Sequence, residues 1–195
     1  MLQESLEGFA ERLRLGLASR TPVEVVRPEA RRAAVAALIT AGSDPAILFI
    51  KRRERVGDPW SGQMALPGGF FSPADASLEA TARRETVEET GIVLAAGALL
   101  GVLDDVSPRT PFLPPLVIRP YAYVVPEPLP AQAGPEVEAA VWLRARDLFD
   151  DRSRRPFVLH VPGGARQFES IVVEGHTIWG LTERVLQQLR EAAGT

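Results

Sequence analysis

The chain has 195 residues, a formal net charge of −3 at neutral pH and no cysteine. Without cysteine there can be no disulfide, no thiolate nucleophile and no cysteine-ligated metal centre. The near-balanced charge argues against a nucleic-acid partner held by phosphate contacts, because such proteins need a basic face. A chain of this length predicts one domain, since domains commonly run to roughly 100–200 residues.

The N-terminal part predicts an amphipathic helix within residues 1–20 that packs on the domain core or on a second subunit of a homodimer. Its apolar residues recur at helical spacing: Leu2, Leu6, Phe9, Leu13 and Leu17. The acids between them argue against an organellar transit peptide, which is normally poor in acids. No apolar stretch approaches the roughly 20 residues that a membrane helix requires. We therefore expect a cytoplasmic protein with no membrane partner.

Beyond residue 22 the pattern mixes strands and helices, which predicts an α/β sandwich with a mixed β-sheet. Strands are expected at Ala33–Thr40, Ala46–Arg52, Ala98–Val106, Leu116–Val125 and Val137–Leu143. A hairpin is expected from Phe157–Val161 and Gln167–Val173 around Pro162-Gly163-Gly164. Helices are expected at Ser77–Thr90, which Gly91 ends, and at Ile178–Ala192.

The second half of the first of these helices carries three acids. Glu85, Glu88 and Glu89 are spaced i, i+3 and i+4, so a helix projects them from one face, where like charges repel. They follow Gly68-Gly69, whose missing side chains allow a close approach of backbone to a ligand or ion. Hard cations such as Mg²⁺ or Mn²⁺ prefer oxygen ligands. A metal site and a solvated acidic face are the two interpretations; zinc is disfavoured because the two histidines stand at no ligand spacing.

This stretch resembles the signature of the Nudix hydrolases. Gly69 is followed by five residues and Asp75, and the second half of the motif is matched in register by Arg84, Glu85, Glu88, Glu89, Gly91 and Ile92. Three positions depart from it. Asp75 stands where glutamate is usual, one extra residue precedes Arg84, and Thr86 occupies an apolar position, where its methyl group can still pack inward.

The resemblance implies a Nudix-type α/β/α sandwich with a catalytic loop–helix–loop and a single Nudix domain over residues 1–195. It also implies hydrolysis, with Mg²⁺ or Mn²⁺, of a nucleoside diphosphate linked to another group. By position, Glu85, Glu88, Glu89 and the Gly69 carbonyl would be the metal ligands, and Arg84 would orient the acids. The general base would be Glu89 or Glu85, or else a loop residue, Glu136 or Glu138.

The segments Leu48–Arg52 and Gly62–Gly69 are similar to the coenzyme A pyrophosphatase branch of the family, although Arg53 and Leu66 depart from its pattern. That similarity implies cleavage of coenzyme A to adenosine 3′,5′-diphosphate and phosphopantetheine. The predicted substrate-binding residues are Arg52, Arg53, Arg55, Trp60 and Gln63. The arginines can fork onto phosphates and Trp60 can stack on adenine, although a solvated basic turn with Trp60 packed inward explains the loop equally well.

A proline-bearing loop, Val106–Pro115, is the predicted wall for the pantetheine arm. ADP-ribose, dinucleoside polyphosphates and nucleoside triphosphates stay open as substrates. A nucleotide-binding module without hydrolytic activity is the alternative from a different class of protein. Its expected mark is a broken acid set, whereas Glu85, Glu88 and Glu89 are all present.

Overall fold

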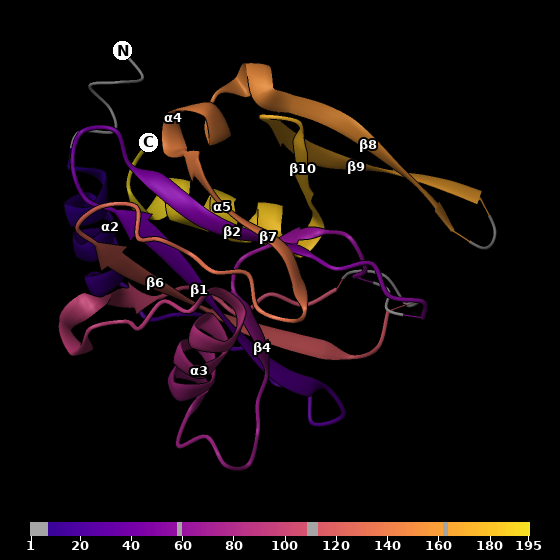
Figure 1. The fold of residues 1–195 in the computed structure, drawn as a ribbon, viewed down its shortest axis with the longest axis horizontal. Coiled ribbons are helices and arrows are strands. Elements are labelled where there is room, and N and C mark those ends of the chain that lie inside the picture. The colour runs from indigo at the N-terminus through magenta and orange to yellow at the C-terminus, as the bar shows by residue number, and fades with distance from the viewer. Residues whose placement is uncertain (1–7, 58–59, 109–112, 162–163) are drawn as a thin grey trace.

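The computed structural model of the chain describes residues 8–57, 60–108, 113–161 and 164–195. Within these residues, a seven-stranded sheet is covered by helices on both faces, and a three-stranded sheet lies beside it (Figure 1). The strands of the larger sheet are β1 (Arg31–Thr40), β2 (Ala46–Arg52), β3 (Met64–Ala65), β4 (Gly68–Phe70), β5 (Leu99–Val102), β6 (Leu116–Val125) and β7 (Val137–Arg144). The α/β class predicted from the sequence is confirmed.

The larger sheet is mixed and divides in the middle. β1 and β6 run parallel along their whole length, while the other pairs are antiparallel. β1 and β2 pair at Ile39 and Ile47 and then diverge. Beyond that point β1 pairs with β4, and β2 pairs with β3 on one edge and β7 on the other. The division leaves room between the two halves of the sheet, and the site lies there.

Alternation along the strands gives the sheet two apolar faces. Ala34, Ala36 and Leu38 of β1 belong to one buried cluster, together with Ala82 of helix α3 (Leu78–Thr90). Ala37 and Ile39 belong to the opposite cluster, which includes residues of the helices α2 (Phe9–Ala18) and α5 (Gly180–Ala192). With α3 on one face and α2 and α5 on the other, the fold is the α/β/α sandwich that the sequence predicts.

The N-terminal helix packs on the chain's own core. Phe9, Leu13 and Leu17 of α2 are buried, whereas Leu2 and Leu6 lie outside the described residues. A Cβ atom on Gly16 would lie 1.9 Å from the Ala192 carbonyl oxygen, so only glycine lets α2 approach the end of α5 this closely. The buried stripe needs no second subunit to cover it.

The second sheet has the order β10-β9-β8 and is antiparallel. It follows the short helices α4 (Ala145–Leu148) and η2 (Asp151–Ser153), and its strands are β8 (Arg154–Val161), β9 (Gly164–Val173) and β10 (His176–Trp179). The predicted hairpin is therefore present, with longer strands. In Figure 1 it reaches away from the body of the molecule.

Two sequence-based boundaries are wrong. Ile178 and Trp179 were expected in the last helix but form β10, because they pair with β9; Gly180, at φ 68°, then separates strand from helix. The strand expected over Ala98–Val106 is shorter, because the 3₁₀-helix η1 (Ala96–Ala98) precedes it and β5 ends at Val102. Among the described residues, no helix has the length and apolarity needed to cross a bilayer.

Candidate active site

The acidic helix α3 has well-defined ends. The Ser77 hydroxyl accepts a hydrogen bond from the Ala80 N–H at 3.1 Å, which satisfies one free donor of the first turn. At the other end Gly91 adopts φ 71°, and its N–H donates to the Val87 carbonyl at 2.8 Å. The predicted helix and its Gly91 C-cap are confirmed, and Ser77, which was expected as the first helical residue, is the N-cap. Glu85, Glu88 and Glu89 therefore project from a rigid element.

The two glycines before this helix allow three elements to meet. A Cβ atom on Gly68 would lie 2.3 Å from the Ala34 carbonyl oxygen, and one on Gly69 would lie 2.4 Å from the Glu85 carboxylate. The Gly68 N–H donates to Oε2 of Glu89 at 2.8 Å. The missing side chains thus let β4 lie against β1 and let the Glu85 carboxylate lie against β4.

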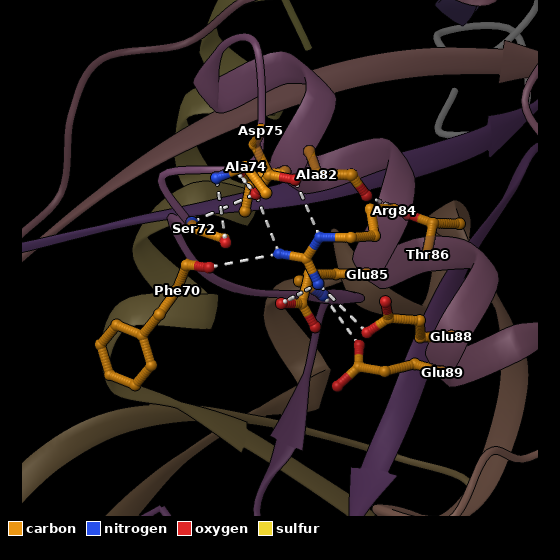
Figure 2. A network of polar contacts seen from close by, with 12 residues as sticks. Phe70, Ser72, Ala74, Asp75, Ala82, Arg84, Glu85, Thr86, Glu88 and Glu89 are labelled. Carbon is orange, nitrogen blue, oxygen red and sulfur yellow. Dashed lines mark hydrogen bonds and ion pairs between the residues drawn. The ribbon is translucent and has the colours of Figure 1, made fainter.

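Arg84 connects the acids of the motif (Figure 2). Its Nε and Nη2 bind the two Asp75 carboxylate oxygens at 2.9 and 3.0 Å, and its Nη1 contacts Glu85 at 2.8 Å and Glu88 at 3.1 Å. The hydrogen bonds from Arg84 are the largest cause that holds the pKa of Asp75 well below its usual range. Asp75 therefore reaches Arg84 despite its shorter side chain and the extra residue between them. Arg84 contacts the acids as the motif implies.

The carboxylates differ in burial and in pKa. Glu89 is 5% exposed, and burial raises its pKa to about 7; the Gly68 hydrogen bond opposes this rise, and the charge of Glu85 adds to it. Burial also raises the pKa of Glu85. The charges of Glu88 and Glu136 raise it further, while the hydrogen bond and the charge of Arg84 lower it. The Glu88 side chain is 57% exposed. Negative charge is thus concentrated where α3 meets β4.

A cavity of about 890 Å³ lies at the division of the larger sheet. The two buried acids, Glu85 and Glu89, line it together with Gly68 and Gly69. Residues of β2, β3 and their connection also line it, as does Glu136, which precedes β7. Its remaining walls come from β1, from the segments flanking residues 109–112, from β6, from the second sheet and from α5 between Gly180 and Glu191.

The predicted substrate-binding residues separate into two groups. Arg52, Trp60 and Gln63 line the cavity. Arg53 is exposed, and neither it nor Arg55 lines the cavity; the Arg55 guanidinium pairs instead with the Glu136 carboxylate at 3.0 Å. Of the predicted proline loop, Val106, Pro108 and Leu113 line the cavity, and residues 109–112 lie outside the described residues.

The two loop glutamates proposed as general bases have different surroundings. Glu138 lies where the pairing of β2 with β7 shifts register, and its carboxylate pairs with Lys51 Nζ at 2.7 Å. It does not line the cavity, whereas Glu136 does. The structure therefore brings Glu136, and not Glu138, to the acids of α3.

The loop that carries Glu136 docks on the end of α3. The N–H groups of Gln132 and Gly134 donate to the carbonyls of Thr90 and Glu89, both at 2.9 Å, so they satisfy acceptors that a helix end leaves free. A Cβ atom on Gly134 would lie 2.2 Å from the Glu88 carbonyl oxygen. Sequence reasoning missed this docking. The signal for it is Gly134, the glycine near the end of the proline-rich loop before β7.

The donor chemistry suits a hard divalent cation, because three carboxylates and a main-chain carbonyl offer oxygen ligands. Within the described residues, no group of three or more acidic or histidine side chains is arranged to hold a metal ion. Glu85 and Glu88 face Arg84 in Figure 2, and Glu89 accepts a hydrogen bond from the Gly68 N–H. Each of these contacts uses one oxygen of the carboxylate, and the predicted ligand set stays a prediction.

The family model for the NUDIX domain matches residues 30–161, which is more than half of the chain. The chain therefore belongs to the NUDIX family. It is a Nudix hydrolase, an enzyme that acts on phosphorus anhydrides. This confirms the resemblance that the spacing of Gly69, Arg84 and the three glutamates indicates.

Curated relatives and solved structures agree with this assignment. The uncharacterized Nudix hydrolase NudL of Cronobacter sakazakii is 29% identical over 160 residues, which cover 82% of this chain and 81% of the relative. NudL of Salmonella paratyphi B has the same identity and coverage.

The fold is shared with solved structures of low identity. A MutT/nudix family protein from Enterococcus faecalis matches with a TM-score of 0.59 at 19% identity, covering 97% of this chain and 73% of the other. A NUDIX hydrolase from Alicyclobacillus acidocaldarius matches with a TM-score of 0.57 at 21% identity, covering 87% of this chain and 98% of the other. The NUDIX domain of Shewanella oneidensis NrtR, solved with ADP ribose, matches with a TM-score of 0.51 at 23% identity, covering 63% of this chain and 80% of the other. The predicted Nudix-type fold is confirmed.

Proposed function

We propose that this Nudix hydrolase cleaves the pyrophosphate of a nucleoside diphosphate joined to another group, and that coenzyme A or a derivative is the preferred substrate. Water and coenzyme A would give adenosine 3′,5′-diphosphate and phosphopantetheine. The observation that carries the proposal is one cavity of about 890 Å³ lined by Glu85, Glu89, Arg52 and Trp60 together with long apolar walls. That volume lies in the range of small-molecule sites, which is about 300–1,000 Å³.

Nudix hydrolases use divalent metals, and we propose Mg²⁺ or Mn²⁺ for this one. Glu85, Glu88, Glu89 and the Gly69 carbonyl would hold the cation. When bound, it supplies positive charge that offsets the negative charge of the diphosphate. Arg84 acts as a positioning residue, because its guanidinium contacts two of these carboxylates while Asp75 holds it in place.

We assign the general base to Glu136, with Glu85 and Glu89 as the alternatives. Glu136 lines the cavity, its loop is fixed to α3 by main-chain hydrogen bonds, and the Arg55 guanidinium pairs with its carboxylate at 3.0 Å. In this role its carboxylate accepts a proton from the attacking water. Because Glu138 does not line the cavity, we do not assign it this role.

The nucleotide half of the substrate would contact β2 and the loop that follows it. Arg52 presents a planar fork for phosphate oxygens beside the acids. Trp60 offers a ring face for the adenine and Gln63 offers an amide for hydrogen bonds. Arg53 and Arg55 do not line the cavity, so the proposal gives them no direct contact with the substrate.

Turnover of coenzyme A with Mg²⁺ or Mn²⁺, with the products identified by mass spectrometry, tests the proposal. We expect cleavage that excess EDTA abolishes and that Glu88→Gln reduces to near background. ADP-ribose, a dinucleoside tetraphosphate and a nucleoside triphosphate belong in the same panel. Preference for any of these would overturn the coenzyme A assignment. Binding without products in the presence of metal would instead identify a nucleotide-binding module.

A further inference from the structure

One face of the second sheet points toward the cavity although it contributes little to the buried core. Cross-strand partners lie on the same side of a sheet, and the register pairs Phe157 with Phe168, Leu159 with Arg166 and Trp179 with Ser170. Four residues of this face line the cavity, and we call them the outer wall: Leu159, Arg166, Phe168 and Trp179.

The aromatic rings of this face pack on one another. The ring centroids of Phe157 and Trp179 are 4.6 Å apart, and those of Phe168 and Trp179 are 5.4 Å apart. All three side chains are only partly buried. The opposite face anchors the sheet, because Ile171, Ile178 and other residues of that face lie in the main apolar cluster. The rings of Phe168 and Trp179 in the outer wall therefore form an ordered aromatic surface that lies outside the main apolar cluster.

Three of the four residues of the outer wall come from a part of the chain beyond residue 161. Glu85, Glu89 and Glu136 lie inside residues 30–161, which the NUDIX family model matches. Phe168 and Trp179 lie beyond residue 161 and reach the same cavity through β9 and β10. These two residues add aromatic rings to the cavity from outside the part of the chain that the family model matches.

We propose that the outer wall binds the group joined to the outer phosphate, and that this group is a flexible chain of apolar and amide segments. The inference rests on the proposed function and assigns the residues that distinguish one substrate from another. Aromatic faces and a leucine offer contact area for methylene and amide groups. Val106, Leu116 and Ile118 line the same cavity and extend this apolar surface.

Two substrates that differ only in this chain test the inference: coenzyme A and the β-methyl ester of 3′-phospho-ADP, which keeps the adenosine, the 3′-phosphate and the pyrophosphate. Leu159→Asn places an amide on the outer wall. Val158→Asn is its matched control, because Val158 is the neighbouring residue on the opposite face and is 49% exposed. Trp179→Ala removes the central ring, and Trp179→Phe retains an aromatic face.

We expect wild-type protein to have a lower KM for coenzyme A than for the methyl ester. Leu159→Asn and Trp179→Ala should each raise the KM for coenzyme A about tenfold and leave the kinetics of the methyl ester unchanged. Loss of binding that is equal in the ground and transition states raises KM without lowering kcat. Val158→Asn and Trp179→Phe should retain the wild-type KM for both substrates. Unchanged methyl ester kinetics also show that each variant is folded.

Equal KM values of the wild-type protein for the two substrates would overturn this inference and leave hydrolysis intact. An equal rise for both substrates in Leu159→Asn and Trp179→Ala, or no rise, would overturn it as well. Failure of the wild-type protein to cleave either substrate with metal present would overturn the proposed function itself.

Discussion

The main-chain N–H of Gly68 donates a hydrogen bond of 2.8 Å to Oε2 of Glu89, so the acidic helix is fastened to β4 by one of its own carboxylates. Glu89 is nearly buried at this position and keeps a defined orientation. Because the Glu89 carboxylate is buried and bonded to a main-chain N–H, the backbone at Gly68 fixes its position. A substitution at the neighbouring Gly69, where an added Cβ atom would lie nearest to the Glu85 side chain, should affect the chemistry more than the stability.

Gly69→Ala should lower kcat by about 100-fold and leave the fold intact, because a displacement of about 1 Å at a reacting group costs on that order. The added Cβ atom would lie 2.4 Å from the Glu85 carboxylate, and a flexible side chain can move away from it. The measurement is kcat together with the midpoint of thermal unfolding. Gly97→Ala is the control, since no atom lies within 4 Å of its added Cβ. Wild-type kcat in Gly69→Ala would contradict the role of Glu85.

Glu136→Gln should lower kcat by about 10²–10⁴-fold, which is the usual contribution of a general base. Glu138→Gln should stay within about twofold of wild type, because the Glu138 carboxylate pairs with Lys51 outside the cavity lining. The two variants remove the same charge two residues apart, so they separate a catalytic effect from a general electrostatic one. A fall in kcat confined to Glu138→Gln would reverse the assignment.

Asp105 should make stability depend on pH in the acid range. Burial raises its pKa, but hydrogen bonds from Arg119 and the Val25 N–H and the charges of Arg119 and Arg32 outweigh this, so the pKa is lowered overall. An aspartate in the unfolded chain has a pKa of about 3.9. Because the pKa of Asp105 is lower in the folded state, its charge stabilises the protein at pH values above about 3.9, and this stabilisation is lost as the pH falls through the pKa of the folded state. Asp105→Asn should lower the free energy of unfolding by about 3 kcal/mol at pH 7.

Urea unfolding of Asp105→Asn and wild type at several pH values measures this effect. The difference between the two proteins should shrink as pH falls below about 4. Asp151→Asn is the control, because its side chain is 81% exposed and its ion pairs lie at the surface. A difference that does not change with pH would show that the packing of Asp105, and not its charge, is what matters.

Thr86→Val should leave stability unchanged or raise it by up to about 1 kcal/mol. Thr86 is fully buried in α3, and its hydroxyl donates to the Ala82 carbonyl at 2.7 Å. The Ala82 carbonyl lies within the helix and can accept a main-chain N–H as well as the Thr86 hydroxyl. Replacing the hydroxyl with a methyl group would therefore leave no buried polar group without a partner. Thermal unfolding measures the change. A loss above about 1 kcal/mol would mean that the hydroxyl has a structural role of its own.

The fold could be predicted where periodicity and caps act locally. Ala46–Arg52 and Leu116–Val125 have the predicted bounds, and Ser77 and Gly91 end the acidic helix as expected. β3 and β4 were missed because two or three residues carry no periodic signal, and their strand character comes from pairing with β2 and β1. Ile178 and Trp179 were misassigned for a related reason, since an apolar pair before a helix fits both states.

The site could be predicted in sequence order but not in space. The spacing of the glutamates places them on one helix face, and Asp75 is bound by Arg84 as the motif requires. The spacing does not distinguish Glu136 from Glu138, because the docking of residues 132–134 on α3 decides which one reaches the cavity. The hairpin that carries most of the outer wall was predicted, but these strands follow the motif by more than 60 residues and gave no signal that they reach the same cavity.

The separation of β1 from β2 bears on the cost of binding. The Ala36 N–H bonds to the Pro67 carbonyl at 2.8 Å, and the Arg52 N–H bonds to the Gln63 carbonyl at 3.0 Å, so strand residues beside the opening keep their main-chain partners. The cavity therefore lies beside strand residues that keep their main-chain hydrogen bonds without a ligand. Because this part of the backbone is already ordered, binding of a ligand carries no entropy cost for ordering it. The affinity is then determined by the side chains that surround the cavity.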